Sequence, residues 1–152
     1  MRVRRIIPIV IAVAAMSWAA PVYAVSYGSS ATPIRATSDG NAAFYGNVTV
    51  HNHQSLYNVY KYKDTAPGGN YVYVQTDWFY WLSCDEDGGD QCFDPSGSDQ
   101  SARTRSGTWV GGTDADDLDP RTDKGRAATK VCEDQSWSPD PCSKKVLVTL
   151  SY

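Results

Sequence analysis

The fold class is decided by residues 71–82, which read YVYVQTDWFYWL. Successive side chains of a β-strand point to opposite faces, so this segment sorts its residues into two sets. One face carries the apolar residues Val72, Val74, Trp78, Tyr80 and Leu82. The other face carries Tyr71, Tyr73, Gln75, Asp77, Phe79 and Trp81. The length of this alternation and its β-branched and aromatic residues predict a long strand at the centre of a sheet.

Shorter segments with the same alternation lie on both sides of this strand. The predicted strands among them cover residues 44–50, 56–63, 102–110, 126–132 and 145–152. Residues 85–101 and 111–125 are rich in small and acidic residues, and we expect them to form surface loops. About six strands without a helix predict an all-β fold, a small antiparallel β-sandwich, because a single flat sheet would leave an apolar face in water. A small closed β-barrel is the alternative.

The first 24 residues have the organisation of a secretory signal peptide. Arginines precede the apolar run 6–15, and Val22-Tyr23-Ala24 resembles a cleavage site. This run is short for a bilayer span and no second apolar stretch follows, so we expect a secreted, extracellular protein whose mature chain does not insert into a membrane. Residues 25–41 are polar and are expected to form a loosely ordered arm, and residues 42–152 a single β domain.

The four cysteines form an even set, as expected for an exported chain that forms disulfides. Four cysteines allow three pairings. Each sequence-adjacent pair encloses a short loop rich in Gly, Pro and Asp, which favours Cys84–Cys92 and Cys132–Cys142. The intervals are too long for the paired spacing of a zinc site. We therefore expect two disulfides that staple loops.

The charged residues and histidines indicate which partners and metal ions the chain could bind. The chain has 14 basic and 17 acidic residues, and a chain with this balance is not expected to bind nucleic acid. Residues 85–90 and 114–119 cluster carboxylates, which calcium prefers, but neither run matches a calcium-binding loop. His51 and His53 would share one face of a continuing strand, yet lack a third ligand. We expect no cofactor, with calcium as the weaker alternative.

The composition is rich in aromatic residues, with 5 Trp, 10 Tyr and 3 Phe, and these are the most informative residues about function. Tyr71, Tyr73, Phe79 and Trp81 share the odd-numbered face of residues 71–82, and exposed rings on a sheet can stack against sugars or a protein. These residues are predicted to bind an extracellular glycan or protein, the alternative being that another layer of the fold covers them.

Trp137 lies in the short segment between the second pair of cysteines. A rigid loop of this kind can insert into a protein target, so we also consider a secreted inhibitor or toxin-like effector that acts through the Cys132–Cys142 loop. No motif of the form G-x-S-x-G or H-E-x-x-H occurs. We therefore expect a non-catalytic binding module with no catalytic residues, and a small secreted hydrolase is the third alternative.

Overall fold

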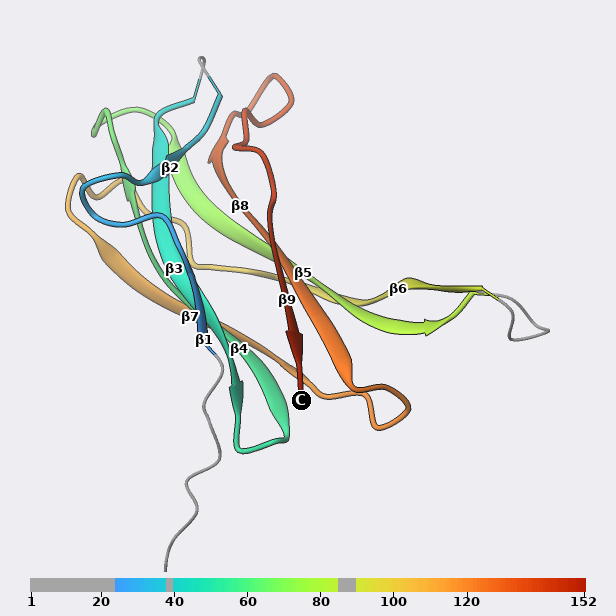
Figure 1. Cartoon of the computed structure of the whole chain (residues 1–152). Helices are drawn as coiled ribbons and strands as arrows, with labels where there is room; N and C mark the ends of the chain where they lie inside the picture. Colours follow the sequence, from blue (N-terminus) through green and yellow to red (C-terminus); the bar gives the residue numbers. More distant parts are fainter. Residues whose placement is uncertain (1–23, 38–39, 85–89) are drawn as a thin grey trace, which may run out of the picture.

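The computed structural model describes residues 24–37, 40–84 and 90–152 of the 152-residue chain, and in them the protein is a sandwich of two antiparallel sheets (Figure 1). The β3 sheet has the strand order β1-β3-β4-β7, and β2 also pairs with β3. Its strands are β1 (Ala24–Tyr27), β2 (Ile34–Arg35), β3 (Ala42–His51), β4 (Ser55–Asp64) and β7 (Val110–Asp117). The β5 sheet has the order β6-β5-β8-β9. Its strands are β5 (Tyr71–Ser83), β6 (Gln91–Gln100), β8 (Lys124–Asp134) and β9 (Val146–Ser151).

The predicted all-β sandwich is confirmed, and the two sheets do not close into a barrel. Residues 71–83 form the long strand β5, which pairs with both β6 and β8 and therefore lies inside its sheet, as predicted. The other alternating segments near residues 44–50, 56–63, 126–132 and 145–152 are also strands. No helix in the described part of the chain has the length and hydropathy to cross a bilayer.

Three predictions of local structure were wrong. Residues 91–100 and 110–117 are strands β6 and β7 rather than loops, and residues 102–109 contribute only an isolated bridge between Thr104 and Val72. Strand β6 reads QCFDPSGSDQ, and most of its side chains are exposed, so it is held by backbone hydrogen bonds to β5 and shows no apolar alternation. Backbone pairing requires no particular side chain, so a polar edge strand resembles a loop in sequence.

The segment expected as a loose arm contributes two short strands. Strand β1 pairs with β3 from Ala24 opposite Thr49 to Tyr27 opposite Gly46, and β2 pairs with β3 farther along. Tyr27 of β1 is buried in the core and Ile34 of β2 packs against it, but strands of four and two residues are too short for alternation to reveal them in the sequence. The predicted signal peptide lies outside the described residues, apart from Ala24.

The core lies between the sheets, and β5 supplies its inward side chains as the alternation predicted. Val72, Val74, Trp78 and Tyr80 are buried on this face. The β3 sheet contributes Phe44, Val48, Leu56, Tyr60 and Tyr62, and β8 and β9 add Ala127, Val131, Val148 and Leu150. Each large side chain buried here stabilises the fold by roughly 1.5–3 kcal/mol relative to exposure.

Two glycines make room for tyrosine rings in this core. Gly46 and Gly112 lie opposite Tyr60 on its two neighbouring strands. A Cβ at Gly112 would lie 2.3 Å from the Tyr60 ring, and one at Gly46 would lie 2.7 Å from the Tyr27 hydroxyl. Without these methyl groups, both tyrosines reach polar groups between the sheets.

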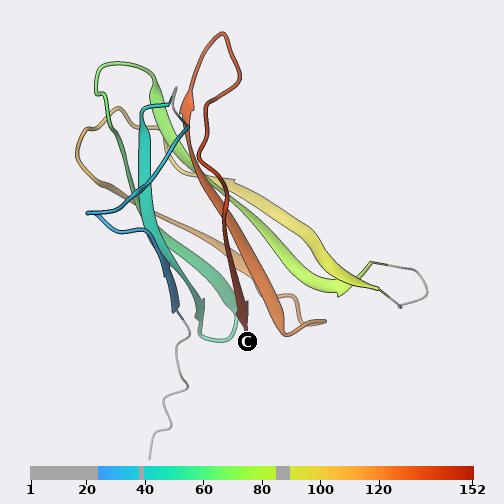
Figure 2. The ribbon, with the colours of Figure 1, turned by 45° about the horizontal axis from the view of Figure 1, so that its top comes forward.

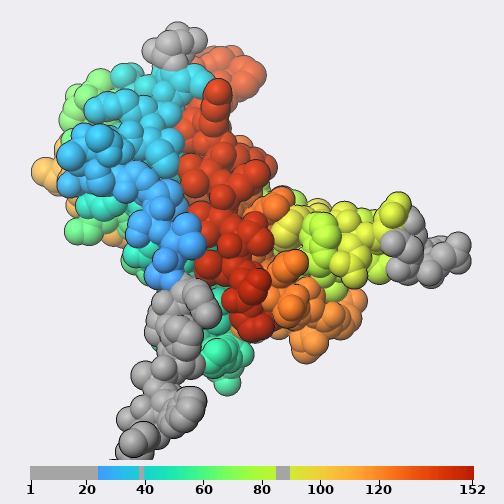
Figure 3. Space-filling model, in the orientation of Figure 1, coloured from blue at the N-terminus to red at the C-terminus, as the bar shows by residue number. Residues whose placement is uncertain are grey.

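The β5–β6 hairpin extends beyond the sandwich as an arm (Figures 1 and 2), and it protrudes clearly in the space-filling view (Figure 3). The pairing of β5 with β8 ends at Tyr80 opposite Gly125, whereas its pairing with β6 continues to Ser83 opposite Gln91. Both predicted disulfides are confirmed. Cys84–Cys92 lies at the end of the arm, and Cys132–Cys142 joins the two sides of the β8–β9 connection.

Candidate functional site

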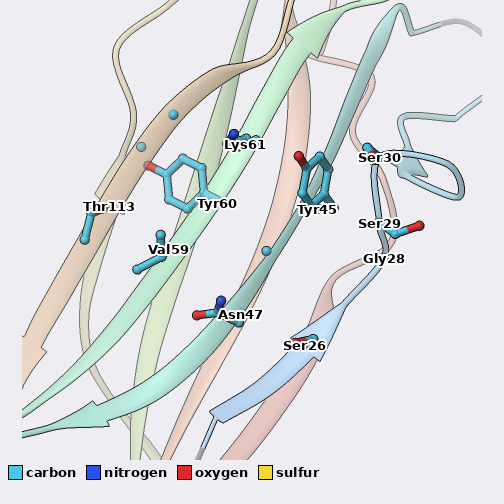
Figure 4. Close-up of a pocket in the computed structure, with 13 residues that line it drawn as sticks. Ser26, Gly28, Ser29, Ser30, Tyr45, Asn47, Val59, Tyr60, Lys61 and Thr113 are labelled. Carbon is cyan, nitrogen blue, oxygen red and sulfur yellow. The ribbon is translucent and has the colours of Figure 1, made fainter.

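A groove with a volume of about 760 Å³ lies on the outer face of the β3 sheet (Figure 4). The strands β1, β3, β4 and β7 and the chain that follows β1 all contribute to it. The side chains that give the groove its chemistry are Ser26, Ser29, Ser30, Tyr45, Asn47, Val59, Lys61 and Thr113.

Strand register places these side chains in two rows. Asn47 of β3, Val59 of β4 and Thr113 of β7 lie opposite one another across three strands. The second row contains Tyr45, Lys61 and Gly111. A Cβ built at Gly111 would meet nothing within 4 Å, so this glycine leaves one end of the second row open.

Tyr45 forms a fixed wall of the groove. Its ring packs against that of Trp109 in a T-shaped arrangement, with the ring centroids 4.9 Å apart. The Lys63 ammonium lies 4.6 Å from the centre of the Trp109 ring. On the other side, the chain after β1 approaches Tyr45 closely at Gly28, whose φ of +60° suits glycine. A ring held in this way loses little conformational freedom on binding a ligand.

Several polar side chains in the groove have no partner among the residues that the structure describes. Asn47, Lys61 and Thr113 make no side-chain hydrogen bond or ion pair with any residue in the described ranges, and the same holds for Ser26 and Ser30. These side chains present an amide, an ammonium and hydroxyl groups that can hydrogen-bond to a ligand in the groove. A groove with one fixed ring and several unused polar groups is suited to a polar ligand with an apolar face.

Behind the groove, a buried polar cluster joins the two sheets. The Tyr60 hydroxyl donates to Asp114 Oδ1 at 2.8 Å, and Thr76 Oγ1 of β5 donates to Asp114 Oδ2 at 2.7 Å. Burial raises the pKa of Asp114, although the hydrogen bonds from Thr76 and Tyr60 oppose this rise. The floor of the groove is thus anchored to the second sheet.

The aromatic residues predicted to bind a ligand lie on the outer face of the β5 sheet, but they do not form one platform. Asp77 lies between the two ends of this face and is paired with Lys145, with an Nζ–Oδ2 distance of 2.7 Å. Ser98 and the side chain of Gln75 also donate to the Asp77 carboxylate. This polar centre separates Tyr71 and Tyr73 from Phe79 and Trp81.

At the first end, arginines cover the rings. Tyr71 is 42% exposed with the Arg105 guanidinium 3.9 Å from its ring centre, and Tyr73 is only 6% exposed, beneath Arg103. Burial and the hydrogen bond to Asp140 raise the pKa of Tyr73 to about 12. Tyr73 therefore presents little of its ring to a ligand. At the other end, Phe79 and Trp81 are half-buried.

Trp137 stands apart from these residues, at the far side of the Cys132–Cys142 disulfide. Its side chain is 100% exposed. Asp140 holds the loop, because its carboxylate accepts hydrogen bonds from the backbone N–H of Gln135 at 3.0 Å and from the Tyr73 hydroxyl at 2.8 Å. The loop thus presents an uncovered indole from a constrained backbone.

The residues considered as metal ligands are placed as follows. Within the described ranges, no group of three or more His, Cys, Asp and Glu side chains is arranged to hold a metal ion. Asp114 to Asp117 belong to β7, whereas residues 85–89 lie outside the described residues. The chain turns at Asn52 and His53, so the strand does not continue through both histidines. His51 instead lies against Tyr57, with the ring centroids 4.8 Å apart.

Sequence reasoning missed the groove. In residues 44–50, Tyr45 and Asn47 alternate with the apolar Phe44 and Val48, and this alternation is the signal in the sequence that places them on the outer face of the strand. The neighbours that complete the groove come from β4 and β7, and β7 was missed because residues 111–125 were predicted to form a loop.

Comparisons with protein-family models, curated proteins and solved structures find no match.

Proposed function

We propose that this protein is a secreted, non-catalytic binding module that holds a neutral glycan in the groove of the β3 sheet. The predicted signal peptide and the two disulfides support an extracellular location. The unpartnered polar side chains of the groove carry the proposal, because a surface that keeps Asn47, Lys61 and Thr113 free beside a fixed ring is arranged for a ligand rather than for its own stability.

A sugar fits the chemistry of these residues. One face of a pyranose ring is apolar and can lie against Tyr45 or the 43% exposed Val59. Its hydroxyl groups both donate and accept hydrogen bonds, as do the Asn47 amide and the Thr113 hydroxyl. The groove volume lies within the range of small-molecule binding sites, about 300–1,000 Å³.

The first test is depletion of the purified, oxidised protein from solution by a panel of insoluble neutral polysaccharides and cell walls, with and without calcium. Gly111→Val is the decisive variant, because Gly111 lines the groove and a Cβ there would meet nothing within 4 Å. Gly97→Val on β6 is the matched control, since a Cβ there also meets nothing within 4 Å but lies outside the groove. We expect Gly111→Val to weaken binding by about ten-fold or more, which corresponds to about 1.4 kcal/mol, and Gly97→Val to bind as the wild type does.

Two outcomes would contradict the proposal: no polysaccharide depletes the wild type, or Gly111→Val is depleted as efficiently as Gly97→Val.

A second candidate function, insertion of the Cys132–Cys142 loop into a protein target, is favoured by the complete exposure of Trp137. Trp137→Ala separates the two functions, because it removes the anchor of that loop and leaves the groove intact.

A further inference from the structure

We propose that the protein has a second ligand site, which binds an acidic polysaccharide at the base of the arm. We call this site the arm patch and define it by Trp81, Phe93, Lys124 and Arg126. It lies on the outer face of the β5 sheet, opposite the groove-bearing sheet, and it is independent of the neutral glycan proposed for the groove.

The arm patch alternates rings and cations. Trp81 and Phe93 lie opposite each other on β5 and β6, with their ring centroids 4.8 Å apart in an edge arrangement. The guanidinium carbon of Arg126 lies 3.5 Å from the centre of the Phe93 ring. The Lys124 ammonium lies 5.8 Å from the Trp81 ring, beside a shallow hollow of about 380 Å³ that both residues line.

The two cations of the arm patch lack carboxylate partners in the described part of the chain. Arg126 uses its Nε to donate to Thr149 Oγ1 at 3.0 Å, and its terminal nitrogens have no hydrogen-bond partner among the described residues. Other cations near this face are neutralised, as Lys145 is by Asp77 and Arg121 by Asp119. Lys124 and Arg126 therefore keep their charge and their donors for a ligand.

These features fit a sugar that bears a carboxylate. The planar, paired donors of a guanidinium match a carboxylate in two parallel hydrogen bonds. A sugar ring joined to that carboxylate would contact the Trp81 indole next to it. The chain carries a net charge of −3, so a polyanion is not attracted to the protein as a whole, and unpaired cations gathered at one place must supply the attraction.

Nucleic acid fits the arm patch less well, although it also combines negative charge with flat rings. Strong binding of a nucleic acid requires neutralisation of several phosphates, and the arm patch offers two free cations. The Phe93 face is already covered by Arg126, which leaves Trp81 as the ring available for stacking.

The test is titration of the full oxidised protein with polygalacturonate, a carboxylated polysaccharide, by isothermal calorimetry at low salt. The double variant Lys124→Gln/Arg126→Gln removes the arm-patch cations. The matched control, Arg35→Gln/Lys144→Gln, removes the same charge from exposed residues elsewhere. We expect polygalacturonate to bind the wild type and the control equally, and the arm-patch variant about ten-fold more weakly or worse.

Three results would overturn this inference: polygalacturonate does not bind, the control weakens binding as much as the arm-patch variant does, or single-stranded DNA binds more tightly than polygalacturonate. Methyl-esterified polygalacturonate should bind poorly, because it lacks the carboxylate charge. Gly111→Val should bind polygalacturonate normally. This variant therefore distinguishes a failure of the arm patch from a failure of the groove.

Discussion

Asp114 is a carboxylic acid that the fold holds between two hydroxyl groups in a buried position, directly behind the groove. Sequence reasoning placed this residue in a solvated acidic loop, because neighbouring aspartates suggested one. In the structure, β7 alternates, and Asp114 is the residue whose side chain points inward to Tyr60 and Thr76. Only the position of the second sheet, which supplies Thr76, makes this burial possible.

The burial of Asp114 predicts how the free energy of unfolding changes with pH. Burial raises its pKa in the folded state above the value in the unfolded chain. The stability associated with the protonated acid is therefore fully present below the unfolded pKa and is lost as the pH rises through the folded pKa. Asp114→Asn cannot ionise, so we expect its free energy of unfolding to increase relative to that of the wild type as the pH rises from acidic values towards neutrality.

Urea unfolding of the two proteins at a series of pH values measures this difference. Asp94→Asn is the control, because Asp94 is exposed on β6. The explanation fails if the difference between Asp114→Asn and the wild type does not change with pH, or if Asp94→Asn shows the same change.

At the scale of elements, alternation located five of the nine strands and missed β1, β2, β6 and β7. Strand β5 was found because both of its faces carry large side chains, whereas β6 and β7 consist largely of small and acidic residues. Residues 102–109 showed the reverse error. Their side chains alternate, but in the structure they form only the isolated bridge between Thr104 and Val72. Arg103 and Arg105 cover tyrosine rings of β5. Local pattern cannot tell a polar edge strand from a loop, since partners are chosen by the whole sheet.

The β3–β4 hairpin turns through Asn52 and His53, which both have positive φ, of 50° and 53°. Asn tolerates this left-handed conformation, but it is strained for most side chains, by about 1–2 kcal/mol per residue. Glycine adopts it freely. We therefore expect His53→Gly to raise the free energy of unfolding by about 1 kcal/mol, measured by thermal and urea unfolding.

Gln54→Gly is the companion variant for this turn. Gln54 follows His53 but does not have positive φ, so glycine there brings no relief and is expected to destabilise slightly. A lower melting temperature for His53→Gly than for the wild type would show that the His53 conformation is not strained.

At the scale of the whole molecule, Asn58 ties the two sheets together. It is completely buried in β4. Its Oδ1 accepts from the Tyr27 hydroxyl at 2.6 Å, and its Nδ2 donates to Thr76 at 2.8 Å and Thr129 at 2.9 Å. One amide thus satisfies polar groups from β1, β5 and β8.

We expect Asn58→Ala to lower the free energy of unfolding by about 2–4 kcal/mol, because it leaves several buried polar groups without a partner. Urea unfolding measures this loss. Asn47→Ala provides the contrast, since Asn47 is on the neighbouring strand with its side chain in the groove, and we expect its stability to stay within about 0.5 kcal/mol of the wild type. Similar losses for the two variants would contradict a joining role for Asn58.

The amino-acid sequence by itself determined the all-β class and the central strand with its two faces, and it favoured the cysteine pairing that the structure confirms. These follow from local rules, because side-chain alternation and short loops are properties of neighbouring residues. Only the tertiary structure decided which strands are neighbours. That order brings Asn47, Val59 and Thr113 together in the groove, and it divides the predicted aromatic face at the Asp77–Lys145 ion pair. Candidate sites assembled from several strands depend on sheet order, which packing of the whole chain sets.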